Sequence, residues 1–219
     1  MSTGEKILNL FFPRKCAFCA SLLEEDGEYL CPRCLTELSP FPAGRRARAF
    51  KGVDFCFSPL PYEGAVRKSL LDYKFSGRRS SCSAYADLII KYIGAENLEC
   101  DYISWVPLSK RRLRSRGYDQ ARLLAHELSR RLGKTEVRLL IKKKNVRAQS
   151  SLKGIEERSA NIRGAYVINK KYIDRLRGKT IVLVDDIVTT GATLGECAGV
   201  LRQYGPALIG AVTVAGSKN

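Results

Sequence analysis

The sequence predicts an α/β protein with a doubly wound, mostly parallel sheet and a small cysteine-rich unit before it. Apolar strand patterns alternate with amphipathic helix patterns from Val53 onward, which is typical of parallel sheets. One strand, Thr180–Val184, is apolar and β-branched without alternation, as expected of a central strand covered on both faces. Ahead of these elements, two C-x-x-C pairs lie within residues 16–34.

Length and charge narrow the class of protein. A chain of 219 residues suits one full α/β domain, which we expect at residues 53–219, and a small appendage at residues 1–52. The formal net charge is +16, and residues 53–219 hold 30 Lys and Arg against 16 Asp and Glu. This excess indicates anionic partners, either nucleic acid or phosphorylated small molecules. General solubility charge is the alternative interpretation.

The sequence also predicts where the protein acts. No apolar run reaches the length of a membrane span, and the first residues lack the basic and hydrophobic regions of a signal peptide. We therefore expect a cytoplasmic protein without a membrane span. In a reducing cytoplasm, the eight cysteines would not form a disulfide framework.

Four of the cysteines predict a metal site. Cys16 and Cys19 form one C-x-x-C pair, and Cys31 and Cys34 form another after eleven intervening residues. Each pair makes a tight knuckle that directs two thiolates to one point, and two knuckles close a tetrahedral zinc site. We expect a structural Zn²⁺ in a zinc ribbon, because so small a segment cannot bury a core of its own. A redox pair is the alternative.

The remaining helices, strands and loops are predicted from residues that interrupt secondary structure and from the spacing of apolar residues. Prolines and a glycine predict a linker at Leu38–Gly52, and Lys110–Arg116 is predicted as a basic loop that faces an anion or water. Apolar positions at helical spacing predict helices at Ala65–Phe75, Ala84–Ile93 and Gln120–Leu132. Apolar runs predict an edge strand at Val53–Tyr62 and further strands at Tyr102–Pro107, Glu136–Ile141, Ala165–Ile168 and Ala207–Ala215.

The central strand leads into the segment with the strongest chemical signal. Asp185 and Asp186 follow it, then small hydroxyl residues surround a glycine at Thr189–Thr193, and a helix is predicted at Leu194–Tyr204. Ligands of open α/β sheets bind beyond the carboxyl ends of strands, and a helix N-terminus there suits a phosphate. Gly191 lets the backbone approach closely, and the carboxylates suit sugar hydroxyls and Mg²⁺. A core strand followed by a Thr-capped helix is the alternative.

This segment closely resembles the phosphoribosyl-pyrophosphate (PRPP) signature of type I phosphoribosyltransferases. Together with the two cysteine pairs and two further motifs, it resembles the ComF family of competence-related, amidophosphoribosyltransferase-like proteins over almost the whole chain. The matching positions of the further motifs are Val106, Pro107, Leu108, Arg112, Arg116, Gly117, Tyr118, Gln120, Gln149, Leu152, Arg158 and Asn161. The sequence departs from the family at Asp119, where Asn is more common, and at Val146, where Thr is common.

The resemblance implies a type I phosphoribosyltransferase fold that binds PRPP with Mg²⁺. It implies a pyrophosphate loop at Leu108–Arg112 and a flexible loop at Lys142–Asn161 that closes over the ligand. The residues expected to bind PRPP are Asp185, Asp186, Thr189, Thr190, Gly191, Ala192, Thr193, Leu108 and Ser109. Those expected to act in catalysis are Asp185, Asp186, Arg112 and Lys110.

Three hypotheses about function follow from the resemblance. The first is a PRPP-binding protein that acts in natural transformation with competence proteins and handles single-stranded DNA. Tyr73, Phe75 and Tyr118 lie near basic residues and would stack on bases in that case, or belong to the core. The alternative is an enzyme that moves phosphoribosyl from PRPP to a base or to ammonia, and a domain that binds PRPP only to regulate is a third hypothesis. The single histidine, His126, lies in a predicted helix, which argues against a Ser-His-Asp hydrolase.

Overall fold

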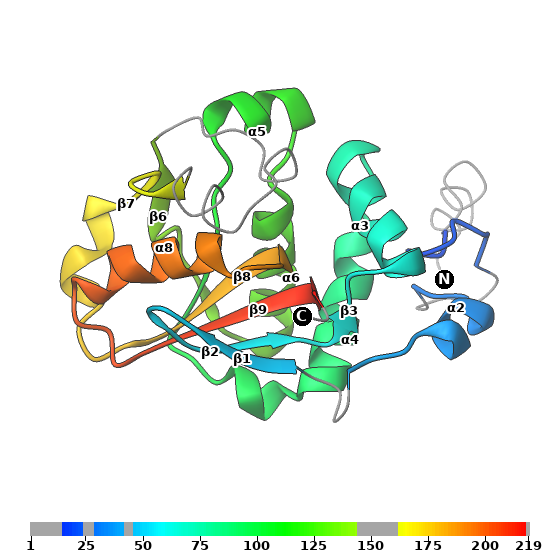
Figure 1. Cartoon of the computed structure of the whole chain (residues 1–219), viewed down its shortest axis with the longest axis horizontal. Helices are drawn as coiled ribbons and strands as arrows, with labels where there is room; N and C mark the ends of the chain where they lie inside the picture. The colour runs from blue at the N-terminus through cyan, green and yellow to red at the C-terminus, as the bar shows by residue number, and fades with distance from the viewer. Residues whose placement is uncertain (1–14, 24–28, 42–45, 144–161, 218–219) are drawn as a thin grey trace, which may run out of the picture.

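A mostly parallel sheet forms the centre of the computed structural model, which describes residues 15–23, 29–41, 46–143 and 162–217 (Figure 1). The strand order is β1-β2-β9-β8-β4-β5, and β3 also pairs with β9. All pairs are parallel except β1 with β2. The strands of this sheet are β1 (Arg46–Phe50), β2 (Val53–Ser58), β3 (Leu60–Pro61), β4 (Tyr102–Trp105), β5 (Thr135–Glu136), β8 (Thr180–Val188) and β9 (Leu208–Gly216).

Strand β8 is the central strand that the sequence predicts. It pairs with β4 on one side and with β9 on the other. Val182 and Val184 pack into the hydrophobic core on one face of the sheet, while Ile181 and Leu183 pack into the core on the opposite face. This alternation explains why the strand is apolar at every position from Ile181 to Val184, since successive side chains of a strand point to opposite faces.

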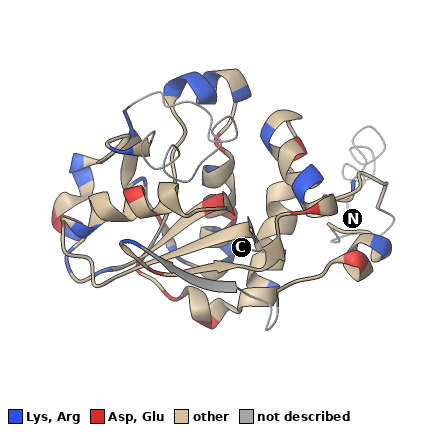
Figure 2. Ribbon diagram, in the orientation of Figure 1, with Lys and Arg blue, Asp and Glu red and all other residues tan. Residues whose placement is uncertain are grey.

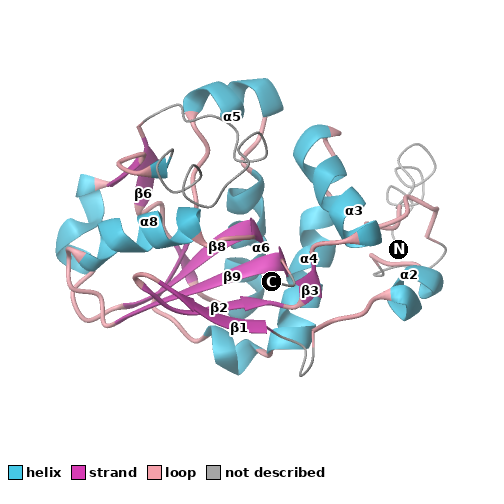
Figure 3. Cartoon of the chain, in the orientation of Figure 1, coloured by secondary structure: helices cyan, strands magenta, loops and turns pink. Residues whose placement is uncertain are grey.

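Helices cover both faces of the sheet. Helices α4 (Ser81–Ile93) and α6 (Gln120–Leu132) cover one face, and α8 (Ala192–Arg202) covers the other (Figure 3). The predicted helix at Gln120–Leu132 is confirmed with the same bounds, because Asp119 caps its first turn and Gly133 ends it in the left-handed conformation, with a φ of 63°. The fold is therefore the predicted doubly wound α/β architecture.

Two further helices lie beyond the carboxyl ends of β8 and β9 (Figure 1). They are α3 (Gly64–Phe75) and α5 (Lys110–Arg116). The prediction of a basic loop at Lys110–Arg116 is wrong, because the segment is helical. The Ser109 hydroxyl accepts a hydrogen bond from Arg112 N at 3.3 Å, and Gly117 ends the helix with a φ of 77°.

The structure also corrects the two ends of the predicted sheet. The predicted linker at Leu38–Gly52 contains β1, whose Arg-Ala-Arg-Ala sequence alternates as a strand does, so β2 is not an edge strand. The predicted strand at Glu136–Ile141 is divided between β5 and β6 (Leu140–Lys142). Strand β6 pairs antiparallel with β7 (Tyr166–Ile168) in a separate two-stranded sheet.

Shorter elements complete the described chain. Helix α2 begins directly after Cys31 and contains Cys34, and two 3-10 helices connect larger elements. Their bounds are α2 (Pro32–Glu37), η2 (Ala95–Leu98) and η4 (Lys170–Arg175). Among the described helices, none combines the length and the apolar character that crossing a membrane requires.

Candidate functional site

Cys16, Cys19, Cys31 and Cys34 form one cluster, named here the cysteine cluster. Their four Sγ atoms lie within 4.8 Å of one another, and those of Cys19 and Cys31 are 3.6 Å apart. The Ser21 hydroxyl lies 3.0 Å from Cys19 Sγ and lowers the pKa of that thiol to about 6. Four converging sulfurs are a donor set that suits tetrahedral zinc. The predicted Cys₄ arrangement is confirmed.

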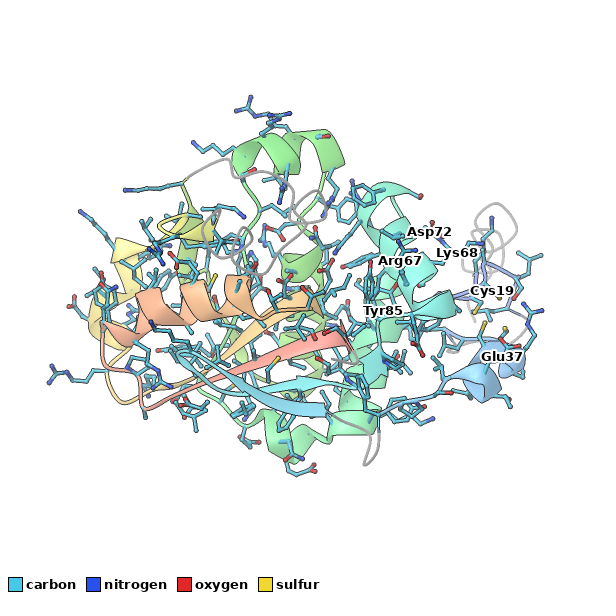
Figure 4. All side chains as sticks on the ribbon, viewed as in Figure 1. Cys19, Glu37, Arg67, Lys68, Asp72 and Tyr85 are labelled. Carbon is cyan, nitrogen blue, oxygen red and sulfur yellow. The ribbon has the colours of Figure 1, made fainter. Side chains whose placement is uncertain are left out.

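Cys16 and Cys34 of the cysteine cluster share a hydrophobic core with Val66 and Leu70 of α3, and Cys19 lies on the side of α3 away from the sheet (Figure 4). The Ser69 hydroxyl of α3 donates a hydrogen bond to Ala17 O at 2.5 Å, and it lies 2.6 Å from the Tyr85 hydroxyl of α4. Just after α3, Arg78 donates from Nη2 to Cys16 O at 3.1 Å. Both bonds reach backbone carbonyls of the first cysteine knuckle. The position of the knuckle and the position of α3 are therefore linked.

A cleft of about 690 Å³ lies at the carboxyl ends of the central strands. Helices α3 and α5, the loop after β4 and the loop between β8 and α8 contribute to its walls. The predicted site residues that line it are Leu108, Arg112, Asp185, Asp186, Thr189, Thr190, Gly191, Ala192 and Thr193. Ser109 and Lys110 do not line it: Ser109 is buried as the N-cap of α5, and Lys110 is exposed.

The two acids lie where one edge of β8 becomes open. Strand β4 ends at Trp105, opposite Val184, so β8 continues past its neighbour. Asp186 donates its backbone N–H to Asp185 Oδ1 at 2.9 Å. Burial raises the pKa of Asp185 well above its ordinary value, and the adjacent Asp186 raises it further. A sugar hydroxyl or a cation would satisfy carboxylates in this position.

Lysine 74 brings a positive charge to this acid pair from α3. Lys74 Nζ lies 2.9 Å from Asp186 Oδ2, with the two side chains 19% and 5% exposed. The contact has the distance of an ion pair, but Asp186 Oδ2 has no partner in hydrogen-bond geometry among the described residues. Sequence reasoning missed Lys74 as a site residue. No local motif marks it, because the contact spans more than a hundred residues and depends on the fold.

The loop between β8 and α8 is shaped by one glycine. Gly191 is the N-cap of α8 and has a φ of 76°, in the left-handed region that glycine adopts without strain. Thr190 Oγ1 accepts a hydrogen bond from Ala192 N at 3.4 Å, and Gly195 N donates to Gly191 O at 2.8 Å as the helix begins. The loop thus leads directly into a helix N-terminus, whose dipole favours an anion.

Two further cations line the cleft, one from α5 and one from β6. Burial lowers the pKa of Arg112, on α5, and burial also lowers the pKa of Lys142, on β6, to about 8. Lys142 Nζ donates a hydrogen bond to the Tyr166 hydroxyl of β7 at 2.8 Å. Partial burial disfavours the charged form of Lys142, and an anionic ligand in the cleft would compensate that charge.

Asp119 has a structural role next to Leu108, which lines the cleft. Its Oδ2 accepts a hydrogen bond from Leu108 N at 3.1 Å, and its Oδ1 accepts one from Arg122 N at 3.3 Å. Burial raises its pKa. The carboxylate therefore joins the loop after β4 to the first turn of α6, at the position where the family more often has Asn.

Some predicted residues lie elsewhere. Residues 144–161 of the predicted flexible loop, with Val146, Gln149, Leu152, Arg158 and Asn161, lie outside the described residues. His126 is on α6 with its side chain 62% exposed, and its Nδ1 lies 2.8 Å from Glu136 Oε2. It does not line the cleft.

Two domain families match the chain. Residues 119–219 match the phosphoribosyl transferase domain, and residues 7–47 match the double zinc ribbon domain. A glutamine PRPP amidotransferase from B. subtilis, solved with ADP and GMP, is a structural neighbour with a TM-score of 0.43 and 18% identity. That comparison covers 65% of this chain and only 30% of the amidotransferase.

Two curated relatives match most of the chain, and a third matches a little under half of it. The DNA utilization protein YhgH of Escherichia coli is 27% identical over 201 residues, which cover 89% of this chain and 86% of that protein. Competence protein ComFC of Streptococcus pneumoniae is 29% identical over 200 residues, covering 87% and 82%. Competence protein F of Haemophilus influenzae is 36% identical over 103 residues, covering 46% and 43%. The double zinc ribbon match and the cysteine cluster together support structural zinc. The chain therefore combines a double zinc ribbon with a domain of the phosphoribosyltransferase fold, and it is similar to these DNA utilization and competence proteins.

Proposed function

We propose that the protein binds PRPP with Mg²⁺ in the cleft and handles single-stranded DNA together with competence proteins. The observation that supports ligand binding is the meeting, in one cavity, of an acid pair, a helix N-terminus and two partly buried cations, Arg112 and Lys142. A sugar carrying phosphates at two positions needs these three kinds of group. A simple anion would need no acids, and a simple cation would need no arginine.

Each chemical group of PRPP has a complementary set of residues in the cleft. The 5′-phosphate binds at Thr189–Thr193, where the α8 dipole and a hydroxyl-rich loop favour it. The ribose hydroxyls bind Asp185 and Asp186, whose oxygens also suit Mg²⁺. The pyrophosphate binds between the loop after β4 and α5, near Arg112 and Lys142. Cations there neutralise the charge that develops on pyrophosphate as it leaves.

Lys74 prepares the acid pair for this ligand. Burial and the adjacent Asp186 favour protonation of Asp185, because both raise its pKa. Lys74, 2.9 Å from Asp186, acts in the opposite direction on the pKa of Asp185 and so favours its carboxylate form. The lysine therefore supports binding of sugar hydroxyls, which donate to carboxylates.

The DNA part of the proposal rests on charge and on the relatives. Their printed names refer to DNA utilization and competence. Lys and Arg occur on α3 and α5 around the acidic end of β8 (Figure 2), and the whole chain carries a net charge of +16. Basic surfaces bind the phosphates of single strands with strong salt dependence. We also propose a cytoplasmic location, where the eight free cysteines would stay reduced.

The alternative is enzymatic transfer of phosphoribosyl to a nitrogenous acceptor, a base or ammonia. Arg112 and Lys142 on the pyrophosphate side favour it, since this transfer needs a stabilised leaving group and no protein nucleophile. Pyrophosphate release from PRPP, measured with a panel of acceptors, separates the two functions. Release with one acceptor supports the enzyme, and no release with any acceptor supports binding alone.

Calorimetric titration with PRPP and Mg²⁺ tests the site itself. The double variant Asp185→Ala, Asp186→Ala removes both carboxylates, and we expect it to lose measurable binding. Asp174→Ala is the matched control, because Asp174 is exposed on η4 and does not line the cleft. Single-stranded DNA binding is then measured at increasing salt. Unchanged PRPP affinity in the double variant would remove the site assignment, and no DNA binding even at low salt would remove the DNA role.

A further inference from the structure

We infer that Phe75 and Arg116 form a binding site for a nucleobase at the rim of the cleft. This inference rests on the proposed function, because the base would belong to a ligand whose sugar phosphate occupies the cleft. The proposed PRPP site gives no role to Phe75 on α3 or Arg116 on α5, although both line the cleft.

The aromatic residues near the cleft differ sharply in exposure. Phe75 is 73% exposed at the end of α3, although a side chain of this kind is normally buried. Tyr73 and Tyr118 are buried, and their hydroxyls donate to the backbone carbonyls of Gln120 and Tyr73. The hypothesis that all three aromatics stack on bases therefore narrows to Phe75 alone.

Arg116 is fixed beside the Phe75 ring. Its guanidinium carbon lies 5.1 Å from the ring centroid, and its Nη1 donates a hydrogen bond to Gln120 Oε1. Arg116 is the last residue of α5, and both residues line the cleft. The hydrogen bond to Gln120 holds the planar guanidinium of Arg116 beside the exposed Phe75 ring. Together they form a surface on which a flat heteroaromatic ring stacks favourably.

This surface lies next to the proposed sugar site. Lys74 precedes Phe75 in the sequence and contacts Asp186. Neighbouring residues of a helix point about 100° apart, so the two side chains reach different parts of the same cleft. If a ribose binds Asp185 and Asp186, the base attached to it would extend toward the rim of the cleft and could contact the Phe75 ring. The class of ligand is thus a nucleotide, either free or at the end of a DNA strand.

Paired titrations test the inference with the full-length protein. Ribose 5-phosphate and adenosine 5′-monophosphate share the sugar phosphate and differ in the base. We expect Phe75→Leu to weaken binding of the nucleotide by about tenfold, because stacking contributes about 1–3 kcal/mol per base, and to leave ribose 5-phosphate unchanged. Phe75→Trp should retain the nucleotide affinity. Leu113→Ala is the control, since Leu113 is 41% exposed on α5 but does not line the cleft.

A short single-stranded oligonucleotide, titrated into the same variants, identifies the source of the base. A loss confined to the oligonucleotide assigns the site to DNA, and a loss confined to the mononucleotide assigns it to a free nucleotide; both support the base site. Equal affinities of wild type and Phe75→Leu for all three ligands would overturn the inference while leaving the proposed function intact. Failure of the wild type to bind either sugar phosphate would instead overturn the proposed function and the inference together.

Discussion

The cysteine cluster and the cleft are built in opposite ways. All four ligands of the cluster come from one short segment, residues 16–34, and their spacing alone brings them together. The cleft takes Lys74 from α3, Arg112 from α5, Lys142 from β6 and the acids from β8. A local metal site can therefore be recognised in a sequence without its fold, whereas a cleft at the ends of parallel strands needs the fold to bring its residues together.

Helix α3 connects these two regions. Ser69 contacts the first cysteine knuckle, and one turn later Lys74 contacts Asp186. Asp72 and Arg78, 3.2 Å apart, continue the link toward Cys16. The zinc ribbon consequently supports one wall of the cleft. Changes in the ribbon should reach the cleft through α3, and changes on the far side of the cleft should not reach the ribbon.

The largest expected effect is loss of zinc. Cys34→Ser should abolish stoichiometric zinc, since structural zinc contributes about 10–16 kcal/mol in zinc-finger peptides. Hydrogen exchange should accelerate at Ala17 and, to a smaller extent, along α3. Cys100→Ser is the control, because Cys100 lies outside the cluster. Full zinc content with unaltered exchange in Cys34→Ser would show that the cluster is not a Cys₄ site.

The second largest effect is expected from removing Lys74, which tests the cleft without changing the zinc ribbon. Lys74→Met leaves Asp186 buried without its cation, and breaking a buried pair costs about 3–5 kcal/mol. Urea unfolding measures this loss. In the double variant Lys74→Met, Asp186→Asn no charge is left unpaired, so most of the stability should return. Equal stability of Lys74→Met and the wild type would mean that the ion pair makes no net contribution.

The cleft should also respond to pH through Lys142. Its pKa of about 8 lies below the ordinary value for lysine, so the ammonium form dominates only below pH 8. Pyrophosphate affinity should therefore fall by up to about tenfold per pH unit above 8. Folding stability should rise over the same range, because the unfolded chain binds the proton more tightly.

Lys142→Met should remove both trends, as followed by calorimetry and urea unfolding between neutral and alkaline pH. Lys143→Met is the matched control, since Lys143 is the exposed neighbour. If Lys142→Met retained the wild-type pH dependence, another group would be responsible for it.

The smallest effect is expected at Asp119. Asp119→Asn keeps one acceptor oxygen and loses one of the two bonds to Leu108 N and Arg122 N, which should cost about 1 kcal/mol. Thermal unfolding measures this cost. PRPP affinity should change little, because the carboxylate faces backbone amides. A large loss of affinity with unchanged stability would instead place Asp119 in contact with the ligand.

The features that could be predicted from the sequence are those formed by residues close together in the chain. The zinc ligands, the central strand and the loop around Gly191 are encoded by adjacent residues, and the structure places them as expected. The sequence pattern did not predict the helix at Lys110–Arg116, because its five like charges suggested a loop. The N-cap Ser109 and the terminal Gly117 favour the helix more than the repulsion between those charges opposes it, since the charged side chains face solvent or the cleft. Lys74 could not be predicted, since only the sheet brings α3 to β8.

A crystal structure of the protein with Mg²⁺ and PRPP would test the binding site most directly. We expect the 5′-phosphate at Thr189–Thr193 and the ribose hydroxyls within hydrogen-bond distance of Asp185 and Asp186. Phosphoribosyl density at any other surface, with the β8–α8 loop contacting no phosphate, would contradict the proposed function.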